Sequence, residues 1–293
     1  MKLHNHIAQP IFSLRLRDES VLNLPKPCVM GVINMSPNSF FNPTCSFSDA
    51  LYTAEKMVAS GVSIIDVGGE ATSPKVHIEN DAPSVQEEID RVCFLIESIS
   101  QKLDVLISVD TSKADVMREA VRCGADLIND QRALGEPGAL DAAAELKVPV
   151  CLMHFFEKPR EPGSTAAAEL LKTVKADLLR SVQRCEVAGI SRDRILIDPG
   201  FGQGNYGKNC KENYYLLSRL TEFLSMDLPI LVGWSRKSMI GDVLNLSADQ
   251  RLHGSISAAT MAAMLGASVI RVHDVKETVE ALTVFRHMAD CYG

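Results

Sequence analysis

The chain has 293 residues, of which 46% are hydrophobic and 23% are charged, and its formal net charge at pH 7 is −7. This composition provides enough apolar side chains for a large core and excludes an intrinsically disordered chain. The negative charge argues against nucleic acid as a partner, because proteins that bind nucleic acid usually present basic patches or a basic domain.

Residues 12–24 alternate between apolar and polar side chains on either side of the turn-like segment Arg17-Asp18-Glu19-Ser20. Such alternation over two short runs predicts a β-hairpin. We assign residues 1–27 to an N-terminal extension that contains this hairpin. We expect the hairpin to plug the bottom of the single domain formed by residues 28–293.

Eight short, almost wholly apolar runs recur along the rest of the chain. They cover residues 28–34, 63–69, 104–110, 126–130, 149–154, 195–200, 229–234 and 268–274. Runs that are too short for helices and apolar on both faces are typical of strands in a parallel sheet that is covered on both sides. Most of the runs carry Asn, Asp, His or Arg at or near their ends, so polar groups gather at the carboxyl ends of the predicted strands.

Apolar side chains at helical spacing fill the intervals between these runs. They predict helices over residues 49–60, 84–102, 113–122, 138–146, 169–188, 213–225, 255–265 and 275–291. Ser84 and Glu87 fit a capping box, and Asp110, Thr111 and Ser112 can cap the helix that follows them. Eight buried strands alternating with helices predict an α/β protein, a (β/α)8 TIM barrel of roughly 250 residues with its active site at the carboxyl ends of the strands.

The N-terminal residues lack the apolar core of a signal peptide, and no run reaches the ~18 apolar residues that a membrane span needs. The eight cysteines include no CxxC pair and no His/Cys spacing of a zinc site. We therefore expect a cytoplasmic protein with reduced thiols and no membrane partner.

Four polar residues come from four different strand ends and would converge over one barrel mouth: Asp110, Asn129, Asp198 and Lys237. Two buried carboxylates and an amide suit a flat nitrogen heterocycle whose ring donors meet a carboxylate. For any one residue, a helix cap or a hydrogen-bonded group at a strand end is an equally good interpretation. Convergence from four strands favours a binding site.

A second set comes from the first and last strands, which are neighbours in a closed barrel: Asn34, Arg271 and His273. Arginine suits bidentate contacts with phosphate, and histidine can add a donor. For His273 alone, a core histidine is the better interpretation. Together the three predict a cationic cluster that binds phosphate or pyrophosphate.

Several carboxylates near the same rim could suggest a metal cage. They are Asp66, Glu70, Asp110 and Asp130. Pyrophosphate chemistry usually needs only Mg²⁺, held by one or two protein groups and by the phosphates themselves. We expect Mg²⁺ and no dedicated transition-metal site.

These residues lie in runs that, in their order along the chain, resemble the bacterial dihydropteroate synthase family. The resemblance extends from about Met30 to Phe285. The runs are Gly31–Phe40, Asp66–Glu70, Ser108–Lys113, Ile128–Asp130, Leu152–His154, Asp198–Gly202, Ser235–Ser238 and Arg271–Val275.

The resemblance implies condensation of 6-hydroxymethyl-7,8-dihydropterin pyrophosphate with p-aminobenzoate to 7,8-dihydropteroate and pyrophosphate, the transferase step of folate biosynthesis that sulfonamides target. It implies a dissociative reaction, in which pyrophosphate leaves before the amine attacks. By this resemblance the pterin would be bound by Asp110, Asn129, Met153, Asp198 and Lys237.

The same resemblance assigns pyrophosphate to Asn34, Arg271 and His273, with Asn34 also a ligand of Mg²⁺. It places p-aminobenzoate among Thr72, Pro74, Phe201 and Ser238. The catalytic set that it implies is Asn34, Asp110, Asp198, Lys237, Arg271 and His273. It further implies a homodimer formed through outer helices.

Three departures from the family pattern lie where p-aminobenzoate should bind. Asn38 stands where the family usually has Asp, and Ser73 stands where it usually has Arg. About three extra residues precede Tyr206. A neutral serine bond is about half as strong as a charge-assisted arginine bond, so we expect p-aminobenzoate and sulfonamides to bind more weakly here than in typical members.

These departures leave alternatives for the second substrate. One is a paralogue that binds pterin pyrophosphate but uses another acceptor amine or has little activity. Another is a pterin-binding barrel of the methyltetrahydrofolate methyltransferase kind, although the runs at Ser235–Ser238 and Arg271–His273 favour the pyrophosphate reaction. A third is a non-catalytic pterin-binding protein.

Overall fold

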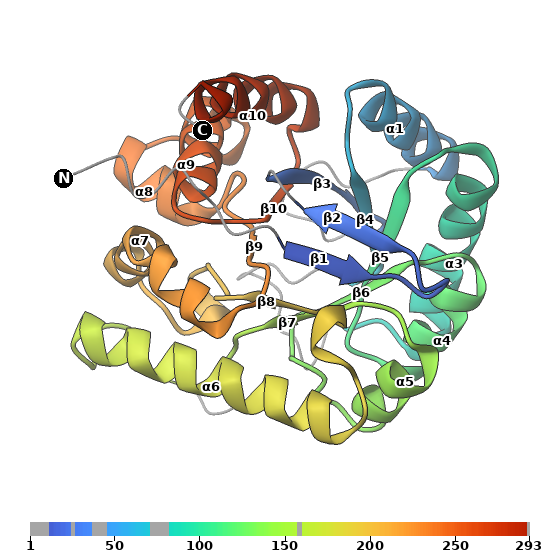
Figure 1. The fold of residues 1–293 in the computed structure, drawn as a ribbon. Helices are drawn as coiled ribbons and strands as arrows, with labels where there is room; N and C mark the ends of the chain where they lie inside the picture. The colour runs from blue at the N-terminus through green and yellow to red at the C-terminus, as the bar shows by residue number, and fades with distance from the viewer. Residues whose placement is uncertain (1–11, 25–26, 37–45, 71–81, 157–159, 292–293) are drawn as a thin grey trace.

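The computed structural model describes residues 12–24, 27–36, 46–70, 82–156 and 160–291. It begins with an antiparallel hairpin of β1 (Phe12–Arg15) and β2 (Val21–Leu24). The hairpin lies across one end of a ring of strands (Figure 1). The predicted N-terminal hairpin is therefore confirmed, whereas the division of the chain at residue 27 stays a prediction.

Eight parallel strands form the ring. They are β3 (Cys28–Asn34), β4 (Ile64–Gly68), β5 (Leu106–Asp110), β6 (Leu127–Asp130), β7 (Val150–Met153), β8 (Ile195–Asp198), β9 (Leu231–Val232) and β10 (Val269–Val272). Their order is β8-β7-β6-β5-β4-β3-β10-β9, and a parallel bridge from Ile197 to Ile230 joins the two ends. The sheet closes on itself, which confirms the (β/α)8 TIM barrel.

Helices surround the barrel. They are α1 (Phe47–Ala59), α3 (Val85–Lys102), α4 (Ala114–Arg122), α5 (Ala139–Leu146), α6 (Ala167–Val187), α7 (Cys210–Ser218), α8 (Ser238–Leu244), α9 (Leu252–Met264) and α10 (Val275–Asp290). The single helix predicted over residues 213–225 is wrong. There α7 ends at Ser218 and a 3-10 helix covers Leu220–Met226, because Arg219 has φ −111° and ψ 17°, outside the α-helical region.

The two predicted helix caps have different outcomes. The capping box of α3 is confirmed, since the Ser84 hydroxyl accepts from the Glu87 N–H and the Glu87 carboxylate accepts from the Ser84 N–H. The predicted cap of α4 is wrong, because the N-cap residue is Lys113 and it makes no side-chain cap. Ser112 instead donates to Asp130 at 2.5 Å, and Asp110 is bound by side chains at the barrel mouth.

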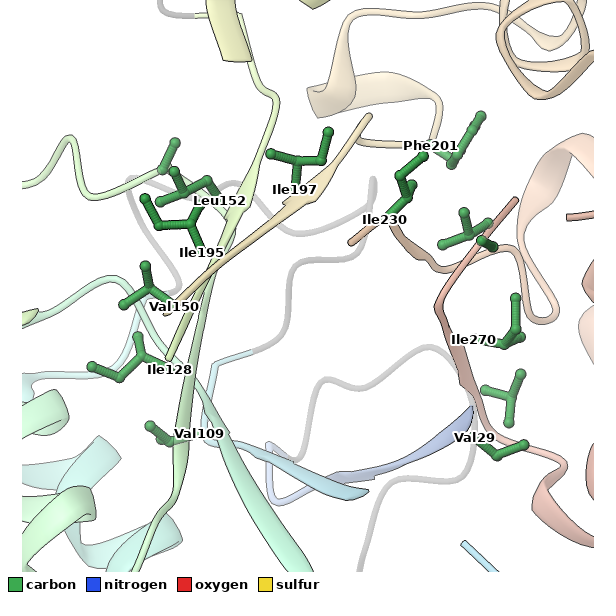
Figure 2. Packing of buried hydrophobic residues seen from close by; sticks show 14 of the residues in the cluster. Val29, Val109, Ile128, Val150, Leu152, Ile195, Ile197, Phe201, Ile230 and Ile270 are labelled. Carbon is green, nitrogen blue, oxygen red and sulfur yellow. The ribbon is translucent and has the colours of Figure 1, made fainter. Parts of the chain in front are cut away.

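Alternate residues of each strand point outwards and pack against the helices. This outer core includes Val109 of β5, Ile128 of β6, Leu152 of β7 and Ile270 of β10, all 0–1% exposed. Figure 2 shows such side chains following one another along neighbouring strands. Because side chains alternate across a strand, the residues between them must point into the barrel.

The lower part of the barrel interior is apolar and continuous with the hairpin. Its buried members are Cys28, Met30, Ile64, Leu127, Cys151, Leu196, Leu231 and Val269, packed with Phe12, Leu14 and Leu24. The hairpin is also pinned from outside, because Arg194 donates to the Leu16 carbonyl at 3.1 Å and pairs with Glu19 at 2.5 Å. The prediction that the hairpin plugs the barrel bottom is confirmed.

The inward-facing positions above this apolar layer are polar. Strand register places Asp110 beside Asn129 and Met153 beside Asp198. Arg271, two residues beyond the inward-facing Val269, faces inwards on β10. The fold thus carries polar groups from separate strands to one mouth, at the carboxyl ends of the strands.

Two further expectations concern the chain as a whole. No helix in the described ranges is long and apolar enough to cross a membrane. Seven cysteines lie in these ranges, and all are free thiols.

Candidate active site

An arginine held between two carboxylates forms the centre of the barrel mouth. The Nε of Arg271 lies 2.6 Å from Asp66, and a terminal nitrogen of the same guanidinium lies 2.6 Å from Asp110. Asp66 is completely buried, and Asp110 is largely buried. Arg271 thus lies against the carboxylates, where its charge neutralises two of them, and its assignment to a phosphate-binding cluster stays a prediction.

Two amides extend this ionic group on β6 and after it. Asn129 donates to Asp66 at 3.1 Å, and Gln131 donates to both oxygens of Asp110 at 2.9 Å. Asp110 therefore has an amide and a guanidinium donor, and both can be exchanged for donors of a ligand. One oxygen of Asp66, Oδ1, is buried and has no hydrogen-bond partner among the described residues.

Burial controls the protonation of the shared carboxylate. It raises the pKa of Asp110 to about 7, an effect that the Asp66 charge increases and the Arg271 charge opposes. Burial disfavours the charged form of Arg271 as well, but the two carboxylates raise its pKa overall. Asp110 is thus poised to change charge near neutral pH.

This pKa makes a prediction for stability. The pKa of Asp110 is near 3.9 in the unfolded chain and about 7 in the folded protein. Protonation of Asp110 therefore contributes fully to the free energy of unfolding below pH 4, and this contribution is lost as pH rises through 7. The free energy of unfolding of Asp110→Asn should therefore decline less between pH 4.5 and 8 than that of wild type, by on the order of 2–4 kcal/mol. Urea unfolding at both pH values measures this. The exposed Asp104→Asn is the control and should follow wild type. An equal decline of the free energy of unfolding with pH in wild type and Asp110→Asn would contradict the prediction.

Asp198 and Lys237 are two oppositely charged groups at the mouth that influence each other's protonation without forming an ion pair. Asp198 accepts the Gly200 N–H at 2.7 Å, and Lys237 donates to the Phe201 carbonyl. Burial raises the pKa of Asp198, while the Lys237 charge lowers it. Burial lowers the pKa of Lys237 to about 8, and Asp198 opposes that change. A buried carboxylate and a half-buried amine therefore favour each other's charged forms.

Lys237 is positioned by its neighbour in the loop after β9. Arg236 adopts the left-handed conformation, with φ 56°. Its guanidinium pairs with both oxygens of Asp274 at 2.6 and 2.8 Å, and it donates to the carbonyls of Ala248 and Asp249 at 3.0 and 2.7 Å. This anchor leaves the Lys237 side chain directed to the mouth, beside Gly233 and Arg271.

The segment that carries the extra residues after Asp198 also reaches the mouth. It contains a 3-10 turn, Gly204–Tyr206. The Tyr206 hydroxyl donates to Gln131 at 3.3 Å, and the Lys237 ammonium lies 4.9 Å from the centre of the tyrosine ring. Tyr206 therefore connects the Asp110 side of the mouth to the Lys237 side.

The other predicted phosphate ligands are neutral. His273 lies against Ser235, with 3.0 Å between Nδ1 and the hydroxyl, and burial with the nearby Arg271 charge lowers its pKa to about 3. Asn34 accepts the Ser36 N–H at 2.9 Å through its side-chain oxygen. The prediction of a cationic cluster is thus reduced to one cation, Arg271, with an imidazole and an amide on neighbouring strands.

Comparison with known proteins agrees with this geometry. A model of the family described as pterin binding enzyme matches residues 30–273. The dihydropteroate synthase of Escherichia coli K12 is 48% identical over 266 residues, covering 90% of this chain and 92% of that protein. The chain belongs to the dihydropteroate synthase family.

Solved structures of dihydropteroate synthases have the same fold. The enzyme of Coxiella burnetii in complex with pteroic acid is 55% identical, covers 96% of this chain and 99% of its own, and superposes with a TM-score of 0.91. The Xanthomonas albilineans enzyme with 4-aminobenzoic acid is 38% identical, with coverages of 95% and 98% and a TM-score of 0.85.

The residues assigned to p-aminobenzoate are the least defined part of this dihydropteroate synthase site. Thr72 and Pro74 lie outside the described residues, as do Asn38 and Ser73. Ser238 is the first residue of α8 and is half-buried. The Phe201 ring is 1% exposed and packs against Trp234 at 5.5 Å, so at the mouth it offers its carbonyl. These assignments stay predictions.

Sequence reasoning missed several groups that the structure brings to the site of this family member. Asp66 was considered only for a metal cage, although an Asp inside the apolar strand Ile64–Gly68 was a signal of function. Gln131 and Tyr206 lie in connecting segments without periodicity. Glu70 pairs with Lys113 at 2.8 Å and Asp130 accepts from Ser112, so these two carboxylates have separate partners.

Proposed function

We propose that this protein catalyses the reaction of its family, condensation of 6-hydroxymethyl-7,8-dihydropterin pyrophosphate with p-aminobenzoate. The observation that carries the proposal is the mouth itself, where buried Asp198 and half-buried Lys237 lie near the ion pair of Asp110 and Arg271. The relatives bound to pteroic acid and to 4-aminobenzoic acid support both substrates.

The two carboxylates account for the pterin half of the reaction. The carbon–oxygen bond to pyrophosphate breaks, pyrophosphate takes the electron pair, and the amine nitrogen bonds to the carbon and loses its proton. Positive charge develops on the pterin as the leaving group departs. Fixed anions aimed at such charge lower the barrier, which is the role we assign to Asp110 and Asp198, with Asn129, Met153 and Lys237 lining the pterin pocket.

Arg271 couples the two halves of the site. In the structure its guanidinium is bound by Asp66 and Asp110. A pyrophosphate offers more acceptor oxygens and more negative charge than either carboxylate. When Arg271 turns towards pyrophosphate, with His273 as a neutral donor, one oxygen of Asp110 is released for the pterin ring donors.

The residues present fit a Mg²⁺ ion of the kind this reaction implies. No group of three or more His, Cys, Asp or Glu in the described ranges could hold a metal. The Asn34 side-chain oxygen accepts one N–H and keeps a second lone pair. That single hard ligand suits Mg²⁺, whose coordination shell would be completed by phosphate oxygens and water. There the ion would neutralise the charge of the leaving group.

Pyrophosphate with Mg²⁺ should raise the melting temperature, and Arg271→Ala should abolish the rise. A ligand that binds only the native state adds about 2.7 kcal/mol at a hundredfold excess over its Kd. Differential scanning fluorimetry with and without Mg²⁺ and pyrophosphate measures the shift. The exposed Arg118→Ala is the control and should keep it. If Arg271→Ala keeps the shift as well, Arg271 does not bind the anion.

Pyrophosphate release in a coupled assay tests the reaction and its acceptor. We expect turnover with p-aminobenzoate above that with other aryl amines. Ser73→Arg should lower the KM for p-aminobenzoate by about ten- to thirtyfold, which corresponds to one charge-assisted hydrogen bond. An unchanged KM would show that Ser73 does not weaken acceptor binding. Absence of turnover with p-aminobenzoate but release with another amine would favour the paralogue interpretation.

We further propose a homodimer formed through the helices at the end of the chain. α8, α9 and α10 pack against one another. They expose large apolar side chains, 37–73% accessible: Val243, Leu244, Met261, Val284 and Met288. Sedimentation equilibrium should give twice the chain mass of 32.0 kDa, and a monomer at micromolar concentration would reject the proposal.

A further inference from the structure

A lysine that no sequence pattern singled out is completely buried beneath the site. Lys208 lies between β8 and α7 and is 0% exposed. Its ammonium donates to the Gly200 carbonyl at 2.8 Å and lies 3.2 Å from Nδ1 of His154. It also lies 5.2 Å from the centre of the Phe156 ring. In the described ranges, no carboxylate forms an ion pair with it.

Burying an ammonium without a carboxylate partner is costly, and lysine is almost never fully buried unless it is paired. The same burial lowers the pKa of Lys208 to about 7, while the Asp198 charge opposes that change. A group that costs stability and that the fold nevertheless retains points to a function at the site.

The neighbours of Lys208 hold it in one orientation. His154 is 2% exposed and completes a chain from α6, because its Nε2 lies 3.2 Å from Asp177. Burial, with the Lys208 charge, lowers the pKa of His154 to about 4, so the ring is neutral. With Lys208 donating to Nδ1, the ring proton must be on Nε2 and donate to Asp177.

The other charged groups around Lys208 are already balanced. Arg160 pairs with Glu212 at 2.6 and 3.2 Å. Lys237 is assigned to substrate at the mouth. Asp198 therefore remains as the carboxylate on which the Lys208 charge acts, and it belongs to the same Asp198–Gly202 segment whose Gly200 carbonyl Lys208 binds.

We infer that Lys208 is a positioning residue for the condensation, held by His154 and Asp177, which fixes the Asp198–Gly202 loop through the Gly200 carbonyl and supplies positive charge behind the Asp198 carboxylate. The inference rests on the proposed function. Lys208 does not touch substrate. Its charge adds to those of Lys237 and Arg271 in favouring the anionic form of the buried Asp198, so that Asp198 can accept the pterin ring donors.

The pH dependence of kcat/KM for pterin pyrophosphate tests this role. Lys208→Met keeps the length of the side chain and removes the charge. Losing this cation should move the acid limb of the profile to higher pH, by up to roughly one unit, because Asp198 then protonates more easily. Asp177→Asn should give a smaller shift in the same direction. Lys211→Met removes an exposed charge three residues away and should leave the profile unchanged.

Other readouts separate this role from a structural one. The KM for p-aminobenzoate and the melting temperature of Lys208→Met should stay close to wild type. A uniform loss of activity with an unmoved acid limb, or a variant that does not fold, would overturn the inference by assigning Lys208 to the stability of the fold. If wild type itself releases no pyrophosphate, the proposed function fails. The pH dependence of pterin affinity, measured by calorimetry, then decides on Lys208.

Discussion

Asp198→Asn and Lys237→Ala should each weaken pterin binding by on the order of 2–5 kcal/mol, the range for truncating a charged group that hydrogen-bonds in a desolvated site. Asp198→Asn removes an anion that favours the charged form of Lys237 and replaces an acceptor of ring donors by an amide that is itself a donor. Lys237→Ala removes the cation that opposes the burial-raised pKa of Asp198. Isothermal titration calorimetry with a pterin ligand measures both losses.

The exposed Lys211→Ala provides the control for charge removal in this region. Its affinity should equal that of wild type. The two losses should not be additive, because each variant disrupts the same pair, and the double variant should bind little worse than the weaker single one. Wild-type affinity in both single variants would show that the pterin pocket lies elsewhere.

The barrel was predictable because its signals are local and repeated. A strand such as Val150–Met153 is buried on both faces, so its sequence reads as one apolar run. Eight such runs separated by helical spacing leave few other architectures. The polar residue at each strand end, such as Asp110, Asn129 and Asp198, was predictable for the same reason, since parallel strands bring their carboxyl ends to one side.

The partners of these residues were not predictable, because they depend on distances across the barrel. The sequence predicted that Arg271 and His273 belong to a cationic cluster that binds phosphate. No spacing indicated that two carboxylates would contact the Arg271 guanidinium. The predicted cap of α4 was wrong for a related reason. Asp110 could cap a helix by local sequence, but an ion pair with a residue 161 positions away took its place.

Lys208 and His154 show a further limit of prediction from the sequence. His154 lies in a run that resembles the family, but nothing in the sequence indicates that Lys208 is buried beside it. Burial of Lys208 results from the path of the Asp198–Gly202 segment, where Gly200 has φ 71° and its carbonyl faces the ammonium. Only a residue in the left-handed backbone conformation gives this path, so a substitution of Gly200 tests it.

Gly200→Ala should destabilise the protein by at least about 4 kcal/mol, a loss that single substitutions reach only through a specific clash or unpaired group. A Cβ at Gly200 would collide with the backbone carbonyl oxygen of His154 and approach the Lys208 ammonium to 3.4 Å. Neither neighbour can move freely, because the His154 N–H donates to the Asp198 carbonyl at 2.8 Å and Lys208 is completely buried. Urea unfolding followed by circular dichroism measures the loss.

Gly189→Ala separates this collision from backbone strain. Gly189 has φ 90°, also in the left-handed region, but a Cβ there would meet nothing within 4 Å. It should cost only about 1–2 kcal/mol, the penalty for an L-residue with this backbone conformation. The difference between the two variants is then the cost of forcing the Asp198–Gly202 loop away from His154. Equal destabilisation of both would mean that the loop yields to the added methyl group and that the His154–Gly200 approach is not rigid.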